Sequence, residues 1–208
     1  LEVHLMLESK GENLSRDAVP SLDFDDLLAT AHALADQAGA VILPHFRTAL
    51  AINNKGGALF DPVTAADLAA ETAIRSALAA THPAHGIVGE EFGSTGTGAD
   101  YCWIIDPIDG TRAFIVGQPL WGTLIGLVRK GRPLLGLMNQ PFTGERYWSG
   151  ERQSYFRHSS GIEQTIHTRA CASLSEALLT ASSPDLFETE EEQDRFAALA
   201  SAVRLRRF

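Results

Sequence analysis

The stretch WIIDPIDGTRAF, from Trp103 to Phe114, decides how the chain folds around its acidic residues. The apolar residues before Asp106 predict a buried strand that ends at this carboxylate. Pro107 has no amide hydrogen and favours a turn, which can bring Asp109 back beside Asp106. Two carboxylates held so close repel each other unless a cation lies between them. Ligation by oxygen atoms alone favours Mg²⁺, Mn²⁺ or Ca²⁺ over zinc.

The residues that follow predict an anion site at the same place. The sequence Gly110-Thr111-Arg112 can begin a helix, and the amide groups at a helix N-terminus bind phosphate. Metal ions next to such amides are typical of phosphoryl-transfer sites. The sequence GEE at Gly89 to Glu91 can add another carboxylate from the end of a neighbouring strand.

Each of these motifs also has a purely structural interpretation. Asp-Pro and Asp-Gly are common turn dipeptides. The tetrapeptide from Thr64 to Asp67 is an ordinary capping box, and Glu90 can belong to a solvated acidic edge. The motifs together favour a site, because Asp106 would be a costly buried carboxylate without a partner.

Composition limits the classes of function. The 208 residues carry a formal net charge of −9, which argues against a broad nucleic-acid-binding surface but not against an anionic substrate beside a metal. Cys102 and Cys171 have no zinc-binding spacing and are expected to be reduced cysteines of a cytoplasmic protein. No run of 18 apolar residues is present, so no membrane span is expected.

The order of elements predicts an α+β fold. Helices are expected at Ser21–Arg47, with Pro44 kinking or ending the first, at Thr64–Ala80, and after Thr189. A hairpin turn is expected at Lys130–Pro133. We expect residues 1–20 to be a leader or disordered tail, residues 21–150 an N-terminal metal-binding α+β domain, and residues 151–208 the start of an incomplete C-terminal α/β domain.

Three motifs in this order resemble those of the inositol monophosphatase superfamily: DPVTAAD, GEEFG and WIIDPIDGTRAF. The superfamily comprises Mg²⁺-dependent, lithium-sensitive phosphatases. The stretches NNKGG, NQPFTGERYW and TRACASLSEALLTASSPDLF look most like its histidinol-phosphatase branch. The resemblance covers residues 23–208 and implies alternating αβαβα layers, of the type shared with fructose bisphosphatase.

The resemblance also implies a set of metal ligands. Glu90, Asp106 and the carbonyl of Ile108 would hold one Mg²⁺, and Asp106 and Asp109 would hold a second, with Mn²⁺ as a substitute and Li⁺ as an inhibitor. Lys55 would either approach the phosphate or help to hold a third ion through ordered water.

The remaining roles concern the water nucleophile and the phosphate. Thr111, hydrogen-bonded to Asp67, would orient and deprotonate the attacking water together with Glu90. The amides of Gly110 and Thr111 would bind the phosphate, which Lys55 would approach, and Arg112 would contact the substrate.

One family motif has no counterpart in this chain. A Trp-Asp pair near the C-terminus adds a ligand for the second metal, but none of Trp103, Trp121 and Trp148 is followed by aspartate. The sequence ends at SAVRLRRF, where the stretch before that pair should begin. We therefore expect the C-terminal part of the family fold to be truncated here, and apolar edges left exposed by this to favour a homodimer.

These features predict a Mg²⁺-dependent phosphomonoesterase that hydrolyses a small phosphorylated alcohol, with histidinol phosphate of histidine biosynthesis as the leading substrate. The alternative enzyme is an inositol-1-monophosphatase or a broader sugar-phosphate phosphatase. An alternative of another class is a non-catalytic regulatory binding protein. The five residues Asp67, Glu90, Asp106, Asp109 and Thr111 favour an enzyme, because a binding module need not keep them.

Overall fold

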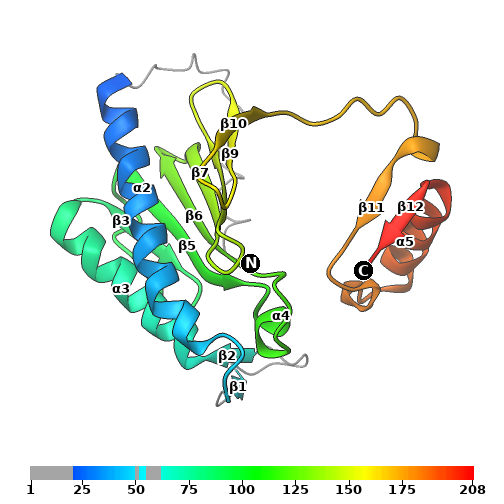
Figure 1. The fold of residues 1–208 in the computed structure, drawn as a ribbon, viewed down its shortest axis with the longest axis horizontal. Helices are drawn as coiled ribbons and strands as arrows, with labels where there is room; N and C mark the ends of the chain where they lie inside the picture. The colour runs from blue at the N-terminus through cyan, green and yellow to red at the C-terminus, as the bar shows by residue number, and fades with distance from the viewer. Residues whose placement is uncertain (1–20, 50–51, 55–61) are drawn as a thin grey trace. The chain divides into compact units, whose positions relative to one another are not determined.

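The computed structural model describes residues 21–49, 52–54 and 62–208, so the expected leader and Lys55 lie outside the described residues. The chain forms two compact units, residues 1–166 and 167–208, and each is treated by itself. The first unit contains the long sheet and two long helices (Figure 1). The first unit therefore ends beyond the predicted boundary at residue 150, because the last two strands of the same sheet follow that point.

A mixed eight-stranded sheet organises the first unit, in the order β10-β9-β8-β7-β6-β5-β3-β4. The single parallel pair among these strands is β3 with β5, and the other neighbours are antiparallel. The strands are β3 (Gly86–Gly89), β4 (Gly93–Thr95), β5 (Tyr101–Asp109), β6 (Gly122–Arg129), β7 (Arg132–Gln140), β8 (Glu145–Ser149), β9 (Ser154–Arg157) and β10 (Glu163–Ile166).

Two helices cover one face of this sheet, α2 (Ser21–Ile42) and α3 (Ala65–Thr81) (Figure 1). The α+β prediction is confirmed. The core between helices and sheet includes Leu34, Ile74, Trp103 and Leu127, each almost inaccessible to solvent. The segment Phe24–His45 is apolar and long enough to cross a membrane, but its apolar stripe packs on β6 and β7. Its composition is therefore explained by core packing.

Local signals in the sequence correspond to the observed element ends. The helix α2 gives way to a 3₁₀ turn, η1 (Leu43–His45), that contains Pro44. Thr64 caps α3 with the expected capping box, in which Asp67 is the third helical residue. The hairpin of β6 and β7 turns at Lys130-Gly131, as predicted. Two short strand pairs complete the first unit: Ile52–Asn54 (β1) pairs with Pro62–Thr64 (β2), and β4 pairs with β3.

The second unit consists of a small parallel strand pair and one helix. Leu178–Thr180 (β11) pairs with Leu205–Arg207 (β12), and between them lies α5 (Glu190–Ala202). Two 3₁₀ turns, η2 (Leu174–Glu176) and η3 (Pro184–Leu186), accompany them. The capping box of Thr189 and Glu192 is confirmed at the start of α5.

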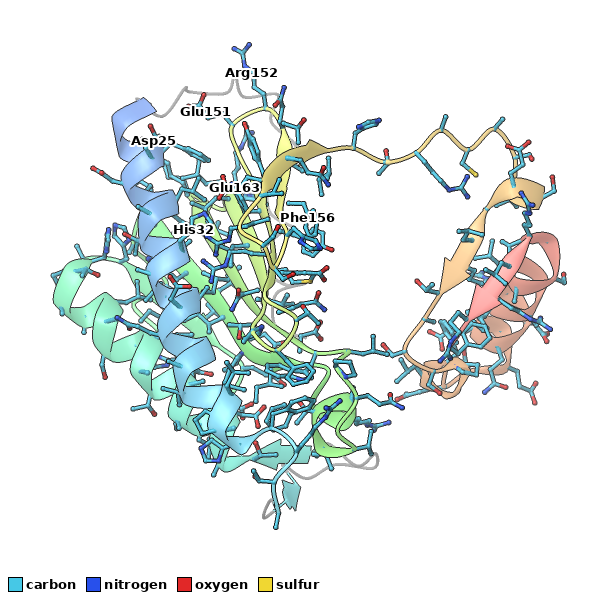
Figure 2. The ribbon with its side chains drawn as sticks, viewed as in Figure 1. Asp25, His32, Glu151, Arg152, Phe156 and Glu163 are labelled. Carbon is cyan, nitrogen blue, oxygen red and sulfur yellow. The ribbon has the colours of Figure 1, made fainter. Side chains whose placement is uncertain are left out.

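A buried arginine ties α2 to the sheet. Arg146 on β8 donates from Nε to Asn139 Oδ1 at 2.9 Å and from Nη2 to Asp36 Oδ1 at 2.5 Å. Its Nη1 lies 3.1 Å from His32 Nδ1, and His32 projects from α2 toward the strands (Figure 2). Burial, and then the positive charges of Arg146 and Arg157, lower the pKa of His32 from 6.5 to about 4, against the opposing effect of Asp36.

This pKa makes the stability of the first unit depend on pH. Between pH 6.5 and about 4, His32 binds a proton in the unfolded chain but not in the folded one, so folding weakens as the pH falls. As the pH falls through this range, the free energy of unfolding of the parent chain decreases. We expect His32→Asn, which keeps an acceptor near Arg146, to make that decrease smaller by about 1–2 kcal/mol, a figure discounted for the partial exposure of the ring. Urea unfolding followed by tryptophan fluorescence measures it, because all three tryptophans lie in the first unit.

The control is the substitution His158→Asn, because His158 is an exposed histidine between β9 and β10. The assignment is wrong if this variant and His32→Asn have the same pH dependence of unfolding.

Candidate active site

The predicted acidic residues gather at one end of two neighbouring strands. The parallel register aligns Gly89 on β3 with Ile105 on β5, and the amide of Glu90 donates to the Ile105 carbonyl at 3.1 Å. Glu90 therefore leaves β3 directly beside Asp106. Parallel strands present their carboxyl ends at the same edge of a sheet, which is why these two residues, distant in sequence, occupy neighbouring backbone positions.

An irregularity in β5 changes the direction of the chain at the site. The pairing of β5 with β6 shifts register between Asp106 and Asp109, as in a β-bulge. Pro107 lies in this interval and cannot donate to the ladder. Its carbonyl instead accepts the hydroxyl of the fully buried Thr123 at 2.9 Å. The predicted turn is thus a bulge held by β6, and no feature of the sequence identified Thr123 as its partner.

The carboxylates interact electrostatically. Partial burial and the negative charge of Glu90 raise the pKa of Asp109, while a hydrogen bond from the Gly110 amide opposes the rise. Oδ1 of Asp106 is shielded from solvent, and Asp106 also lines an open hollow of about 650 Å³ together with apolar residues such as Leu124 and Met138. The site therefore combines one shielded carboxylate oxygen, on Asp106, with the exposed acids Glu90 and Asp109.

The available donor atoms suit a hard divalent cation. They are the carboxylate oxygens of Glu90, Asp106 and Asp109 and the carbonyl of Ile108, with no sulfur or imidazole ligand among them. In the parts of the chain that the structure describes, no group of three acidic, histidine or cysteine side chains lies close enough together to hold an ion. Burial and, second, the negative charge of Glu90 raise the pKa of Asp109, and a bound cation would offset both effects.

Thr111 and Asp67 lie near this edge, with partners that differ from the expected ones. Thr111 begins α4 (Thr111–Ile115), and its hydroxyl donates to the Ile108 carbonyl at 3.0 Å rather than to Asp67. Oδ2 of Asp67, which is buried, accepts the amide of Thr64 at 2.9 Å and its hydroxyl at 2.5 Å. Because β2 contacts α4, the capping box of α3 still lies at the edge that carries Thr111.

The other predicted contacts concern the phosphate and the substrate. Arg112 lies on α4 and is exposed. The helix α4 has only five residues, so its dipole is small, and the Gly110 amide donates to Asp109 in this structure. Phosphate binding by Gly110 and Thr111, substrate contact by Arg112 and the role of Lys55 stay predictions.

Gly110 occupies a conformation that only glycine adopts easily. Its φ is +89°, and a Cβ at this position would lie 2.6 Å from the Leu120 carbonyl oxygen. The sequence signal was the Asp-Gly dipeptide, which indicates a turn without identifying the close approach of Leu120. Gly110 thus fixes the step from Asp109 into α4.

We expect Gly110→Ala to lower the free energy of unfolding of the first unit more than Gly131→Ala does. Both glycines have positive φ, which costs alanine about 1–2 kcal/mol, but Gly131 has open space around it. The collision with Leu120 should add about 1–3 kcal/mol at Gly110. Urea unfolding of the two variants measures the difference, and equal losses would contradict this account of Gly110.

Comparison with known proteins agrees with this geometry. Residues 23–208 match the model of the inositol monophosphatase family. The chain is 42% identical over 190 residues to the bifunctional phosphatase IMPL2, chloroplastic, of Arabidopsis thaliana, covering 89% of this chain and 53% of that protein. It is 37% identical over 186 residues to a histidinol-phosphatase of Streptomyces coelicolor, covering 87% of this chain and 69% of that protein.

Solved structures give the same result. An inositol monophosphatase from Zymomonas mobilis superposes with a TM-score of 0.73 at 42% identity, covering 88% of this chain and 69% of that one. The chain spans about half the length of the Arabidopsis relative, so the activity of that whole protein is not assigned to this chain. The match over residues 23–208 establishes that the chain belongs to the inositol monophosphatase family.

Proposed function

We propose that the protein is a Mg²⁺-dependent phosphomonoesterase acting on a small phosphorylated alcohol, with histidinol phosphate as its substrate. The observation that carries the proposal is the meeting of Glu90 and Asp106 at the ends of β3 and β5, with Asp109 and the start of α4 next to them. Such a set of oxygen ligands beside backbone amides suits the polarisation of a phosphate ester.

Different residues of the site would bind the metal, accept a proton and orient the phosphate. Glu90, Asp106, Asp109 and the Ile108 carbonyl would hold Mg²⁺, which when bound neutralises phosphate charge and makes water more acidic. Glu90 would accept the proton of the attacking water. The amides of Gly110 and Thr111 at the start of α4 would bind the phosphate, and the left-handed conformation of Gly110 directs the chain into that helix.

The choice of substrate rests on relatives. The proteins from Streptomyces coelicolor and Mycobacterium tuberculosis, 37% and 34% identical to this chain, are histidinol-phosphatases. An inositol-1-monophosphatase is the second candidate, since a probable inositol 1-monophosphatase of Mycobacterium tuberculosis is 41% identical over 121 residues. The proposal includes a cytoplasmic homodimer, on the grounds of composition and resemblance.

Phosphate release from histidinol phosphate and from inositol-1-phosphate, each with and without Mg²⁺, tests the proposal. We expect Mg²⁺-dependent release, faster with histidinol phosphate. Faster release from inositol-1-phosphate would favour the second candidate. Absence of release from both by a folded chain would favour a non-catalytic binding protein.

We expect Asp109→Asn to lower kcat at least about 100-fold, because a neutral amide binds a divalent cation poorly and loss of even an outer-shell partner costs 10–100-fold. The fold should persist, as the side chain lies at the end of β5. The control, Asp194→Asn, removes the same charge from the exposed surface of α5 and should leave kcat unchanged. Parental activity in Asp109→Asn would show that Asp109 is not a ligand.

A further inference from the structure

A second buried carboxylate lies one helical turn beyond Asp67. Glu71 on α3 is fully buried. A buried carboxylate is costly unless hydrogen bonds and an opposite charge compensate it, so its partners show what it is held for. None of the three sequence motifs includes Glu71.

The partners of Glu71 are the backbone amides directly after Glu90. Its Oε2 accepts the amide of Glu91 at 2.7 Å, and its Oε1 accepts the amide of Phe92 at 3.2 Å. The approach is so close that a Cβ on Gly89 would collide with the carboxylate. Glu71 is therefore bonded or packed against the backbone on both sides of Glu90.

Arg75 completes the contact from the same helix. Its Nε donates to Glu71 Oε1 at 2.7 Å, and it balances the buried charge. The same guanidinium donates to the Gly93 carbonyl and, at 2.9 Å, to the Thr95 hydroxyl. Hydrogen bonds with Glu71 and Arg75 thereby hold the turn between β3 and β4, which begins at Glu90, against α3.

We propose that Glu71 is a positioning residue that holds Glu90 in place for cation binding, with Arg75 as its charge partner. The inference rests on the proposed function, in which Glu90 is a metal ligand. Glu71 itself touches neither metal nor substrate. It acts through the Glu91 and Phe92 amides, which limit where the backbone can place the Glu90 side chain.

Binding of Mn²⁺ to the full chain, followed by electron paramagnetic resonance, tests the role without requiring turnover. In Glu71→Gln one of the three N–H donors faces an amide NH₂ group, so the turn loosens. We expect the Kd for Mn²⁺ to rise about 10-fold, as for other outer-shell substitutions. The Mg²⁺ concentration for half-maximal activity should rise similarly, while kcat recovers at excess Mg²⁺.

Asp36→Asn is the matched control. It breaks a carboxylate–arginine pair on α2, the pair with Arg146, which lies outside the turn that carries Glu90. We expect it to lower the free energy of unfolding without changing the Kd for Mn²⁺. A role of Glu71 in stability alone would give the same pattern for Glu71→Gln.

Arg75→Gln keeps the two backbone hydrogen bonds of Glu71 and tests the inference if Glu71→Gln does not fold. It should weaken Mn²⁺ binding by about 3-fold or more, below the full outer-shell effect. Unchanged Mn²⁺ affinity in every folded variant, with binding by the parent chain, would overturn the positioning role alone. Failure of the parent chain to bind Mn²⁺ would contradict the proposed metal site and, with it, this inference.

Discussion

The parallel pairing of β3 with β5 is the constraint on which the site depends. It places the end of β3 beside Asp106 through the hydrogen bond from the Glu90 amide to the Ile105 carbonyl. Without that register, Glu90 would not lie beside the segment that carries Asp106. The core supports the pairing, because Trp103 and Ile105 on β5 pack with residues of α2 and α3 on the helical face of the sheet. The chemistry at the edge therefore depends on the burial behind it.

Buried charges connect the helices to this sheet at two places. Arg146 joins β8 to α2, and Glu71 with Arg75 joins α3 to the turn after β3. A buried ion pair gives little net stability compared with apolar packing, but loss of one partner is expensive. Of the two carboxylates, Glu71 is buried and Asp36 is exposed, so the loss of a partner should cost more at Glu71. Only the pair of Glu71 and Arg75 contacts the turn that carries Glu90.

The sequence predicted what depends on local rules and failed where the partner is remote. Capping residues such as Thr64 and Thr189 marked helix starts, and the alternation around Lys130-Gly131 marked the hairpin, because these signals act within a few residues. The motif around Asp106 identified the site by resemblance. The partners Thr123, Glu71 and Arg75 were missed, because each acts across the fold on a backbone group that carries no sequence signature. The acceptor of the Thr111 hydroxyl differs from the expected Asp67 for another reason: the local turn at the start of α4 offers the Ile108 carbonyl, three residues back.

The central claim is that the acids at the ends of β3 and β5 form one cation site. The most direct measurement is isothermal titration of Mn²⁺ into the parent chain, Asp106→Asn and the charge-matched surface variant Asp194→Asn. The account predicts binding by the parent and by Asp194→Asn, and binding at least about 100-fold weaker in Asp106→Asn, more than an outer-shell loss causes. Equal Mn²⁺ affinity in all three proteins would contradict it.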